Sequence, residues 1–204
     1  MKTFHLDVNN ESGWERMHEE RLFYCPHIQV YRVTYRTPGR PNGGVVWTVA
    51  RRKNAVIVAP QLEDGRFLLI RQERLPIQRT IWEFPAGQID EIERKDDSEI
   101  ICATALRELE EETGYCLKSD GGKLISLGYY FSSQGFTDEH AYLFLARNVE
   151  PISERKSQLG EGSEHIAEAR AFSLEEIQTM IHENVIIDAN TLVLISKLLC
   201  SKLA

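Results

Sequence analysis

A segment from Ser98 to Thr113 carries two chemically different faces at helical spacing, and it constrains the fold more than any other feature of the chain. The residues that share one side of this segment are mostly apolar, namely Cys102, Ala105, Leu106, Leu109 and Thr113. Gly114 follows directly, in the position where a helix-ending glycine belongs. The pattern predicts a helix over 98–113 whose apolar side packs on a core.

The polar side of this helix carries an unusual concentration of negative charge. Glu108, Glu111 and Glu112 stand at positions i, i+3 and i+4, which turns three carboxylates in a similar direction. Like charges at this spacing destabilise an isolated helix by a few tenths of a kcal/mol per pair. Hard divalent cations such as Mg²⁺ bind carboxylate oxygens and bridge them to substrate phosphates. The face is therefore either a cation site or, as for many acidic helices, a solvated surface.

The overall charge limits how a ligand could be held. A chain of 204 residues with a net charge of -7 and a pI near 5.5 has little general attraction for nucleic acid or for an anionic membrane. No run approaches the roughly 20 apolar residues that a membrane helix needs. We expect no nucleic acid polymer and no membrane as partner. A phosphate-bearing ligand would need local arginines or a metal ion.

The cysteines are informative through their spacing. Cys25, Cys102, Cys116 and Cys200 are widely scattered, with no CxxC pair, which gives neither a zinc framework nor an evident disulfide plan. Reduced thiols are typical of the cytoplasm, and the amino-terminal stretch lacks a cleavable apolar core. We therefore expect a soluble, cytoplasmic protein.

Strand and helix patterns alternate along the chain and predict an α/β (α+β) fold. Residues 27–52 hold two β-rich runs around "TPGRPNGG", which predicts an antiparallel hairpin or small sheet. A second hairpin is expected from "NAVIVAP" and "RFLLIRQE" across the turn at 63–65. Three further strands are predicted at "KLISLGYYF", "HAYLFLARNV" and "EARAF". Two further helices are predicted at "SLEEIQTMIHEN", opened by Ser173, and at "DANTLVLISKLLC".

A turn motif, "WEFPAGQID" at 82–90, precedes the acidic helix, and the two together resemble a known signature. The segment "RELEEETGY" from Arg107 to Tyr115 matches every specified position of "REUxEExGU", the second half of the Nudix hydrolase signature, where U is aliphatic or aromatic. Gly87 matches its first glycine, and "EFPAG" resembles the branch that acts on ADP-ribose and nucleoside diphosphate sugars. The resemblance implies an α/β/α sandwich with a mixed β-sheet, plus an amino-terminal antiparallel hairpin or sheet. It also implies an extension at 1–52 that serves dimerisation and a Nudix hydrolase domain at 53–204.

The resemblance assigns the cation site. It implies that Glu108, Glu111, Glu112 and the carbonyl of Ala86 are metal ligands, with Mg²⁺ as the cofactor and Mn²⁺ as a substitute. It also implies that Arg107 orients the glutamates, and that a glutamate of a later loop, or else a glutamate of the signature such as Glu112, accepts the proton from water. In the segment "GEGSEH", Glu164 matches that loop carboxylate best, and Glu161 is the alternative.

The resemblance also assigns substrate contacts. Arg74, in "LLIRQERLP", matches an arginine that reaches the substrate phosphates, whereas Arg71 is interpreted as an edge-strand charge that deters aggregation. Trp47, in "VVWTVARR", matches a tryptophan that stacks on adenine, often across a dimer, and a buried strand tryptophan is the alternative. Arg52 would lie near the phosphates, and Glu83 of "EFPAG" is expected to bind substrate.

Two departures from the family pattern stand out. Glu93 keeps the family spacing from Gly87 and Glu99 keeps the spacing to Arg107, so about six extra residues lie between them. We favour Glu99 as the equivalent residue, because helix register is rigid and loops absorb insertions. Gln134 in "SSQGFTDEH" replaces a proline that ADP-ribose hydrolases usually have, which leaves the substrate open.

The predicted reaction is hydrolysis of the pyrophosphate of a nucleoside diphosphate linked to another moiety, with ADP-ribose giving AMP and ribose 5-phosphate. GDP-mannose, ADP-glucose, another nucleotide sugar and a dinucleoside polyphosphate are alternative substrates. A Nudix domain that senses ligand without catalysis is a further alternative. We expect the substrate, a small-molecule nucleotide, to be bound by a homodimer. The dimer would form through residues 1–52, because Trp47 and the hairpin would otherwise expose apolar surface.

Overall fold

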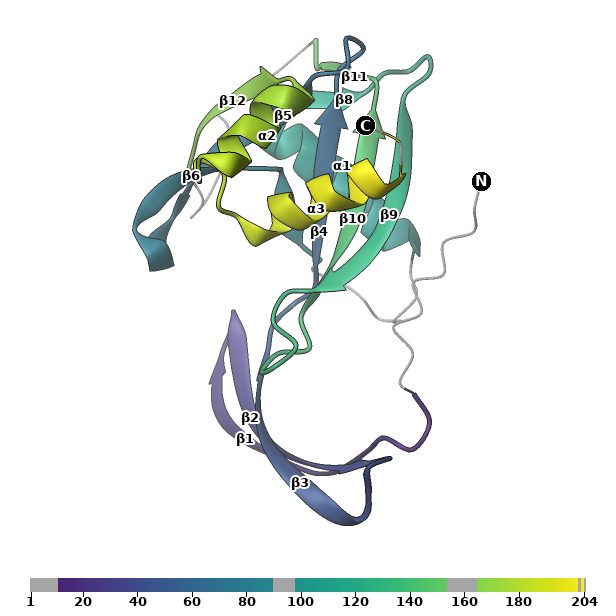
Figure 1. The fold of residues 1–204 in the computed structure, drawn as a ribbon, viewed down its shortest axis with the longest axis vertical. Coiled ribbons are helices and arrows are strands. Elements are labelled where there is room, and N and C mark those ends of the chain that lie inside the picture. Colours follow the sequence, from purple (N-terminus) through teal and green to yellow (C-terminus); the bar gives the residue numbers. More distant parts are fainter. Residues whose placement is uncertain (1–10, 90–97, 154–164, 202, 204) are drawn as a thin grey trace.

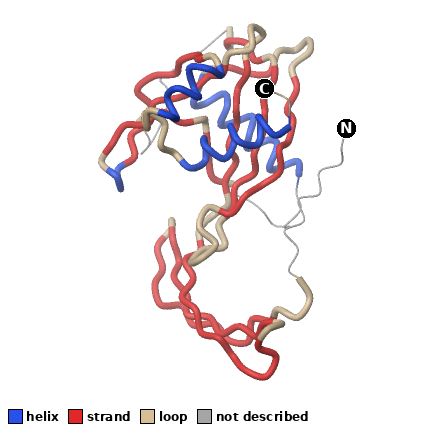
Figure 2. The backbone as a smooth tube through the Cα atoms, in the orientation of Figure 1, coloured by secondary structure: helices blue, strands red, loops and turns tan. Residues whose placement is uncertain are grey.

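The computed structural model describes residues 11–89, 98–153, 165–201 and 203. An antiparallel sheet of three strands comes first, formed by β1 (Glu15–Cys25), β2 (Ile28–Thr37) and β3 (Arg40–Arg51) in that order. Figures 1 and 2 show it as a separate lobe below the rest of the fold, joined to it by loops. The hairpin expected at 27–52 is present as β2 and β3. β1 was not expected, because its run is charged and almost entirely exposed rather than clearly alternating.

A second sheet forms the centre of the molecule, with strand order β12-β5-β4-β10-β9 and with β6 on β5 and β7 on β4. Its strands are β4 (Ala55–Gln61), β5 (Phe67–Arg74), β6 (Arg79–Glu83), β7 (Ala86–Gln88), β9 (Lys123–Phe131), β10 (His140–Arg147) and β12 (Ile166–Phe172). β4 and β10 are parallel, while the other neighbours are antiparallel. The mixed sheet that we expected is therefore present.

The hairpin expected between β4 and β5 is only partly formed. The two strands pair at a single position, Gln61 with Phe67, and then separate. β6 pairs along β5 and β7 pairs along β4, so the chain between β6 and β7 crosses from one strand to the other. That crossing is residues 84–85, within "WEFPAGQID". The turn motif thus lies in the gap between β4 and β5, which we call the split between these strands.

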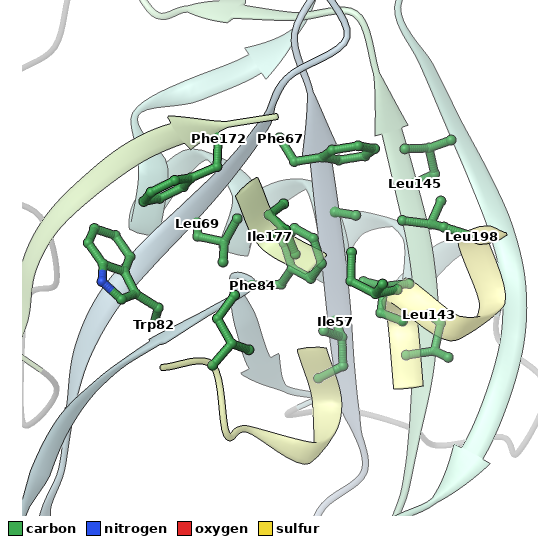
Figure 3. Packing of buried hydrophobic residues seen from close by; sticks show 14 of the residues in the cluster. Ile57, Phe67, Leu69, Trp82, Phe84, Leu143, Leu145, Phe172, Ile177 and Leu198 are labelled. Atoms are coloured by element: carbon green, nitrogen blue, oxygen red, sulfur yellow. The ribbon is translucent and has the colours of Figure 1, made fainter. Parts of the chain in front are cut away.

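Helices cover both faces of this sheet. α2 (Leu174–His182) and α3 (Ala189–Ser201) pack on one face through a cluster that includes Ile177, Leu194 and Leu198. Figure 3 shows this cluster, with Phe84 of the turn motif pointing into it. α1 (Ser98–Thr113) packs on the other face through a separate cluster. The arrangement is the expected α/β/α sandwich. Within the described part of the chain, no helix is both long and apolar enough to cross a membrane.

Local signals explain where the helices begin and end. Gly114 adopts a φ of 73° after α1, and its N–H bonds the Glu110 carbonyl at 2.9 Å, as expected for a helix-ending glycine. Ser173 opens α2 with a capping box to Glu176. A 3-10 helix at Leu75–Ile77 follows β5. β8 (Tyr115–Leu117) and β11 (Val149–Pro151), which we did not predict, form a small two-stranded sheet.

Candidate active site

The acidic face of α1 lies against the turn motif. Glu108 and Glu112 are buried, with 8% and 4% of their surface exposed, whereas the side chain of Glu111 is 58% exposed. The expected common direction therefore holds for Glu108 and Glu112, which are about one helical turn apart and both buried. Glu111 lies at the exposed edge of this acidic face. The reason is geometric, because a residue three positions along a helix falls about 60° short of a full turn and one four positions along falls about 40° beyond it.

Gly87 makes close approach of Glu108 possible. A Cβ atom built on Gly87 would lie 1.9 Å from both the Cδ and the Oε1 atoms of Glu108. Any larger residue would occupy the space that the carboxylate fills. Beside it, the Ala86 N–H donates a hydrogen bond of 2.8 Å to Oε2 of Glu112. Both buried glutamates thus contact the Ala86–Gly87 backbone, which fixes α1 relative to the turn.

Arg107 connects two of the glutamates. Its Nη2 lies 2.5 Å from Oε1 of Glu108, and its Nη1 lies 2.7 Å from Oε2 of Glu111. Burial acts to lower the pKa of Arg107, but the neighbouring charges of Glu108 and Glu111 outweigh it, so this pKa is raised. The guanidinium stays charged and holds the two carboxylates in place. This geometry agrees with an orienting role for Arg107.

Hard oxygen donors make up the possible cation site. Glu108, Glu111 and Glu112 offer carboxylate oxygens, the ligands that Mg²⁺ prefers, and the missing Cβ of Gly87 leaves room for one of them. Within residues 11–89, 98–153 and 165–201, no three acidic, histidine or cysteine side chains converge closely enough to enclose a cation in their present positions. Arg107 and the Ala86 N–H hold the carboxylates instead. The donor types fit Mg²⁺, and binding would require these side chains to rotate.

The arginine that we expected to bind the substrate phosphates, Arg74, lies on β5. Arg74 Nε is 2.9 Å from Oε1 of Glu83, and Glu83 is only 1% exposed. This pair brings together two of the residues that we expected to bind substrate. Glu83 lies opposite Ile70 on β5, so the Arg74 side chain reaches back along the strand toward the turn motif.

The interpretation of Arg71 as an edge-strand charge is wrong. β5 pairs with β12 on one side and with β6 on the other, so it is an interior strand. Arg71 is half-exposed and lies 3.8 Å from Glu168 of β12, in a surface ion pair. Surface pairs of this kind contribute little to stability, typically about 0–1 kcal/mol.

Trp47 and Arg52 lie at the junction with the amino-terminal sheet. Trp47 is 53% exposed, which excludes the alternative of a buried strand tryptophan, and its Nε1 donates to the Gly135 carbonyl at 2.8 Å. Arg52 Nη1 lies 3.4 Å from Glu139 Oε1. Both side chains therefore contact the loop that carries Gln134, rather than the glutamates of α1. In the described part of one chain, the expected base contact, Trp47, and the expected phosphate contact, Arg52, therefore lie at this loop and not at the acidic face of α1.

The remaining expectations fall on other parts of the chain. Glu99 lies in the first turn of α1 and is exposed. Glu93, Glu161 and Glu164 lie outside the described residues. Sequence reasoning missed Thr191 of α3, whose Oγ1 accepts a 2.9 Å hydrogen bond from the Phe84 N–H of the turn. The only local signal is an Asp three positions before a Thr, which predicts a helix cap but not its distant partner.

Known proteins share this sequence and fold. The NUDIX domain family model matches residues 51–192. The chain is 34% identical over 143 residues to an ADP-ribose pyrophosphatase of Bacillus subtilis, covering 70% of each chain. It is 31% identical over 151 residues to a methanol dehydrogenase activator of Bacillus methanolicus, covering 74% of each. The crystal structure of an ADP compounds hydrolase aligns with a TM-score of 0.68 and 18% identity, covering 93% of this chain and 94% of that one. The chain belongs to the NUDIX domain family and is a Nudix hydrolase.

Proposed function

We propose that this Nudix hydrolase cleaves the pyrophosphate of ADP-ribose to give AMP and ribose 5-phosphate, in a reaction that depends on Mg²⁺. The observation that carries the proposal is the buried pair Glu108 and Glu112 against the Ala86–Gly87 backbone. This arrangement occurs in a chain that is 34% identical to an ADP-ribose pyrophosphatase. The two carboxylates lie beside the turn that crosses from β5 to β4, and this is where the cation would bind.

The ligands proposed for Mg²⁺ are Glu108, Glu111, Glu112 and the Ala86 carbonyl, with Mn²⁺ as a substitute. A bound divalent ion would neutralise charge on the pyrophosphate and lower the pKa of a water molecule. Such an ion also reconciles an acidic protein with an acidic substrate, because it reverses the local charge. The ion pairs of Arg107 with Glu108 and Glu111 support its role of orienting these ligands.

The other steps are assigned to side chains of this chain. Arg74 would bind the negative charge on the phosphates, a role that an arginine fork suits. Glu164, with Glu161 as its alternative in the same segment, or else Glu112 of the signature would accept the proton of the attacking water. Glu83, the last residue of β6 before the turn, would hold Arg74 within reach of the substrate through their ion pair. Trp47 would stack on the base and Arg52 would approach the phosphates, both from a partner subunit.

The test of substrate is a comparison of rates. Phosphate release would be measured, after a phosphatase exposes the new monoesters, with ADP-ribose, GDP-mannose, ADP-glucose, UDP-glucose and diadenosine polyphosphates, each with and without Mg²⁺. We expect ADP-ribose to be hydrolysed fastest and only with Mg²⁺. A higher kcat/KM for a hexose nucleotide would reassign the substrate and implicate Gln134. Binding of ADP-ribose with no turnover of any substrate would indicate a ligand sensor instead.

The proposal includes a cytoplasmic homodimer that forms through the amino-terminal sheet. Large apolar side chains are exposed on this lobe, namely Trp14, Met17, Leu22, Phe23, Tyr24, Val46 and Trp47. Exposure of so many large apolar side chains on one small sheet supports an interface there. A partner would also supply the base contact that one described chain does not bring to its own glutamates. All four cysteines are free thiols, which suits a reducing compartment.

A mass measurement checks the dimer. Light scattering after gel filtration should give twice the 23.4 kDa of one chain. Val46→Lys, which charges a position that is 58% exposed on β3, should shift the protein toward monomer because it places an unpaired charge in the apolar contact. Val185→Lys is the matched control, since Val185 is a similarly exposed valine outside this lobe. A monomeric wild-type protein, or equal effects of the two variants, would contradict the proposed interface.

A further inference from the structure

A buried backbone donor lies at the centre of the turn motif. β6 ends at Glu83 and β7 begins at Ala86, so the Phe84 N–H lies between the strands and has no place in a ladder. Phe84 is 1% exposed. A buried N–H without a partner would cost about 1–3 kcal/mol. Thr191 of α3 supplies the partner, 107 positions along the chain, at 2.9 Å.

The direction of the Thr191 hydroxyl is set by Asp188. Oδ2 of Asp188 accepts from the Thr191 N–H at 2.8 Å and from its Oγ1 at 2.9 Å. Since a hydroxyl has one hydrogen, donation to Asp188 leaves the oxygen lone pairs for Phe84. Thr191 is fully buried, so water does not compete for this oxygen. Asp188 thus fixes Thr191 as an acceptor toward the turn.

The two residues that follow Phe84 are held from other directions. The Pro85 carbonyl accepts from the Val58 N–H of β4 at 2.9 Å. The Ala86 N–H donates to Glu112 of α1 at 2.8 Å. Three consecutive turn residues are therefore anchored to α3, β4 and α1. α3 and α1 lie on opposite faces of the sheet, and this turn in the split between β4 and β5 connects them.

We infer that Thr191, oriented by Asp188, is a positioning residue that sets the Ala86 backbone and the Glu112 carboxylate for binding of a divalent cation. The inference rests on the proposed function for the identity of the cation ligands. It assigns the carboxy-terminal helix a part in the chemistry on the opposite face of the sheet. A purely structural role would affect stability alone, whereas a positioning role also affects cation affinity.

The test compares cation affinity with stability in four variants. Thr191→Val keeps the shape of the side chain but cannot accept a hydrogen bond, and Thr191→Ser keeps the hydroxyl. Asp188→Asn keeps a good helix cap while it weakens the orientation of the hydroxyl. Leu198→Ala, seven positions beyond Thr191 in the same helix and fully buried, removes core contacts but leaves the Thr191 hydroxyl and Asp188 in place, so it is the control for destabilisation. Free Mn²⁺ would be measured by electron paramagnetic resonance, and unfolding by circular dichroism.

We expect Thr191→Val to raise the Mn²⁺ dissociation constant about tenfold, Asp188→Asn about threefold and Thr191→Ser less than about twofold. Leu198→Ala should lower the unfolding temperature with an unchanged dissociation constant. The inference is overturned if wild-type protein does not bind Mn²⁺, or if Thr191→Val binds it as wild type does. It is also overturned if Leu198→Ala weakens binding equally, or, where Thr191→Val does not fold, if Asp188→Asn leaves binding unchanged. Absence of ADP-ribose turnover with these Mn²⁺ shifts intact would reject the proposed substrate but support the positioning role.

Discussion

Replacement of Glu112 by glutamine should reduce kcat on ADP-ribose on the order of 10²–10³-fold while the protein stays folded. The amide oxygen of glutamine can still accept the hydrogen bond of 2.8 Å from the Ala86 N–H, so the turn keeps its anchor on α1. The negative charge is lost, and with it the proposed cation ligand and one of the proposed acceptors for the proton of water. Steady-state kinetics at saturating Mg²⁺, with calorimetric titration of Mn²⁺, measure both consequences.

Glu110→Gln is the matched control for this change. Glu110 lies on the same helix, and its side chain is exposed, so the chemical substitution is identical but falls outside the candidate site. We expect this variant to retain kcat within about twofold, as is usual for surface positions. Equal losses in the two variants would point to the net charge of the helix. Full activity of Glu112→Gln would exclude Glu112 as base and as essential ligand.

Local patterns were enough to locate most elements. The helix at 98–113 was predicted because an amphipathic period ends at a glycine, and that glycine has the expected positive φ. The α2 cap at Ser173 was predicted for a similar reason. β1 was missed because its exposed, charged residues lack the alternation of a strand with one buried face.

Long-range features of the site could not be read from the sequence. β4 and β5 separate after one paired position because β7 pairs with β4 and β6 pairs with β5 in its place. The hairpin pattern of the sequence does not indicate this pairing. Likewise, the bond from Phe84 to Thr191 joins residues that are far apart in the chain. The different burial of Glu108 and Glu111 does follow from helix geometry, but only once the packed face is known.

Gly87→Ala should cost about 1–3 kcal/mol in the free energy of unfolding and should remove most of the activity. The new Cβ would lie 1.9 Å from the carboxylate carbon of Glu108, so that side chain must leave its place against the turn. Its ion pair with Arg107, at 2.5 Å, would be disturbed at the same time. Denaturant unfolding measures the first effect, and kcat/KM with Mg²⁺ measures the second.

Gly39→Ala provides the matched control, because a Cβ at Gly39 meets nothing within 4 Å. We expect this variant to retain the activity of wild type, with a stability change within about 0.5 kcal/mol. Comparable losses in the two alanine variants would show that any change at a glycine is harmful and would remove the case for a specific cradle.

A double-mutant cycle separates the steric cost from the catalytic one. Glu108→Ala removes the atoms that the new Cβ would meet, so in the Glu108→Ala background the Gly87→Ala change should cost much less stability than it does alone. Activity should remain low in every variant that lacks Glu108, because the proposed cation ligand is missing. If the stability costs of the two changes simply add, Glu108 does not occupy the space beside Gly87 in solution. If activity returns in the double variant, Glu108 is not a cation ligand, and the glycine serves only the packing of α1 on the turn.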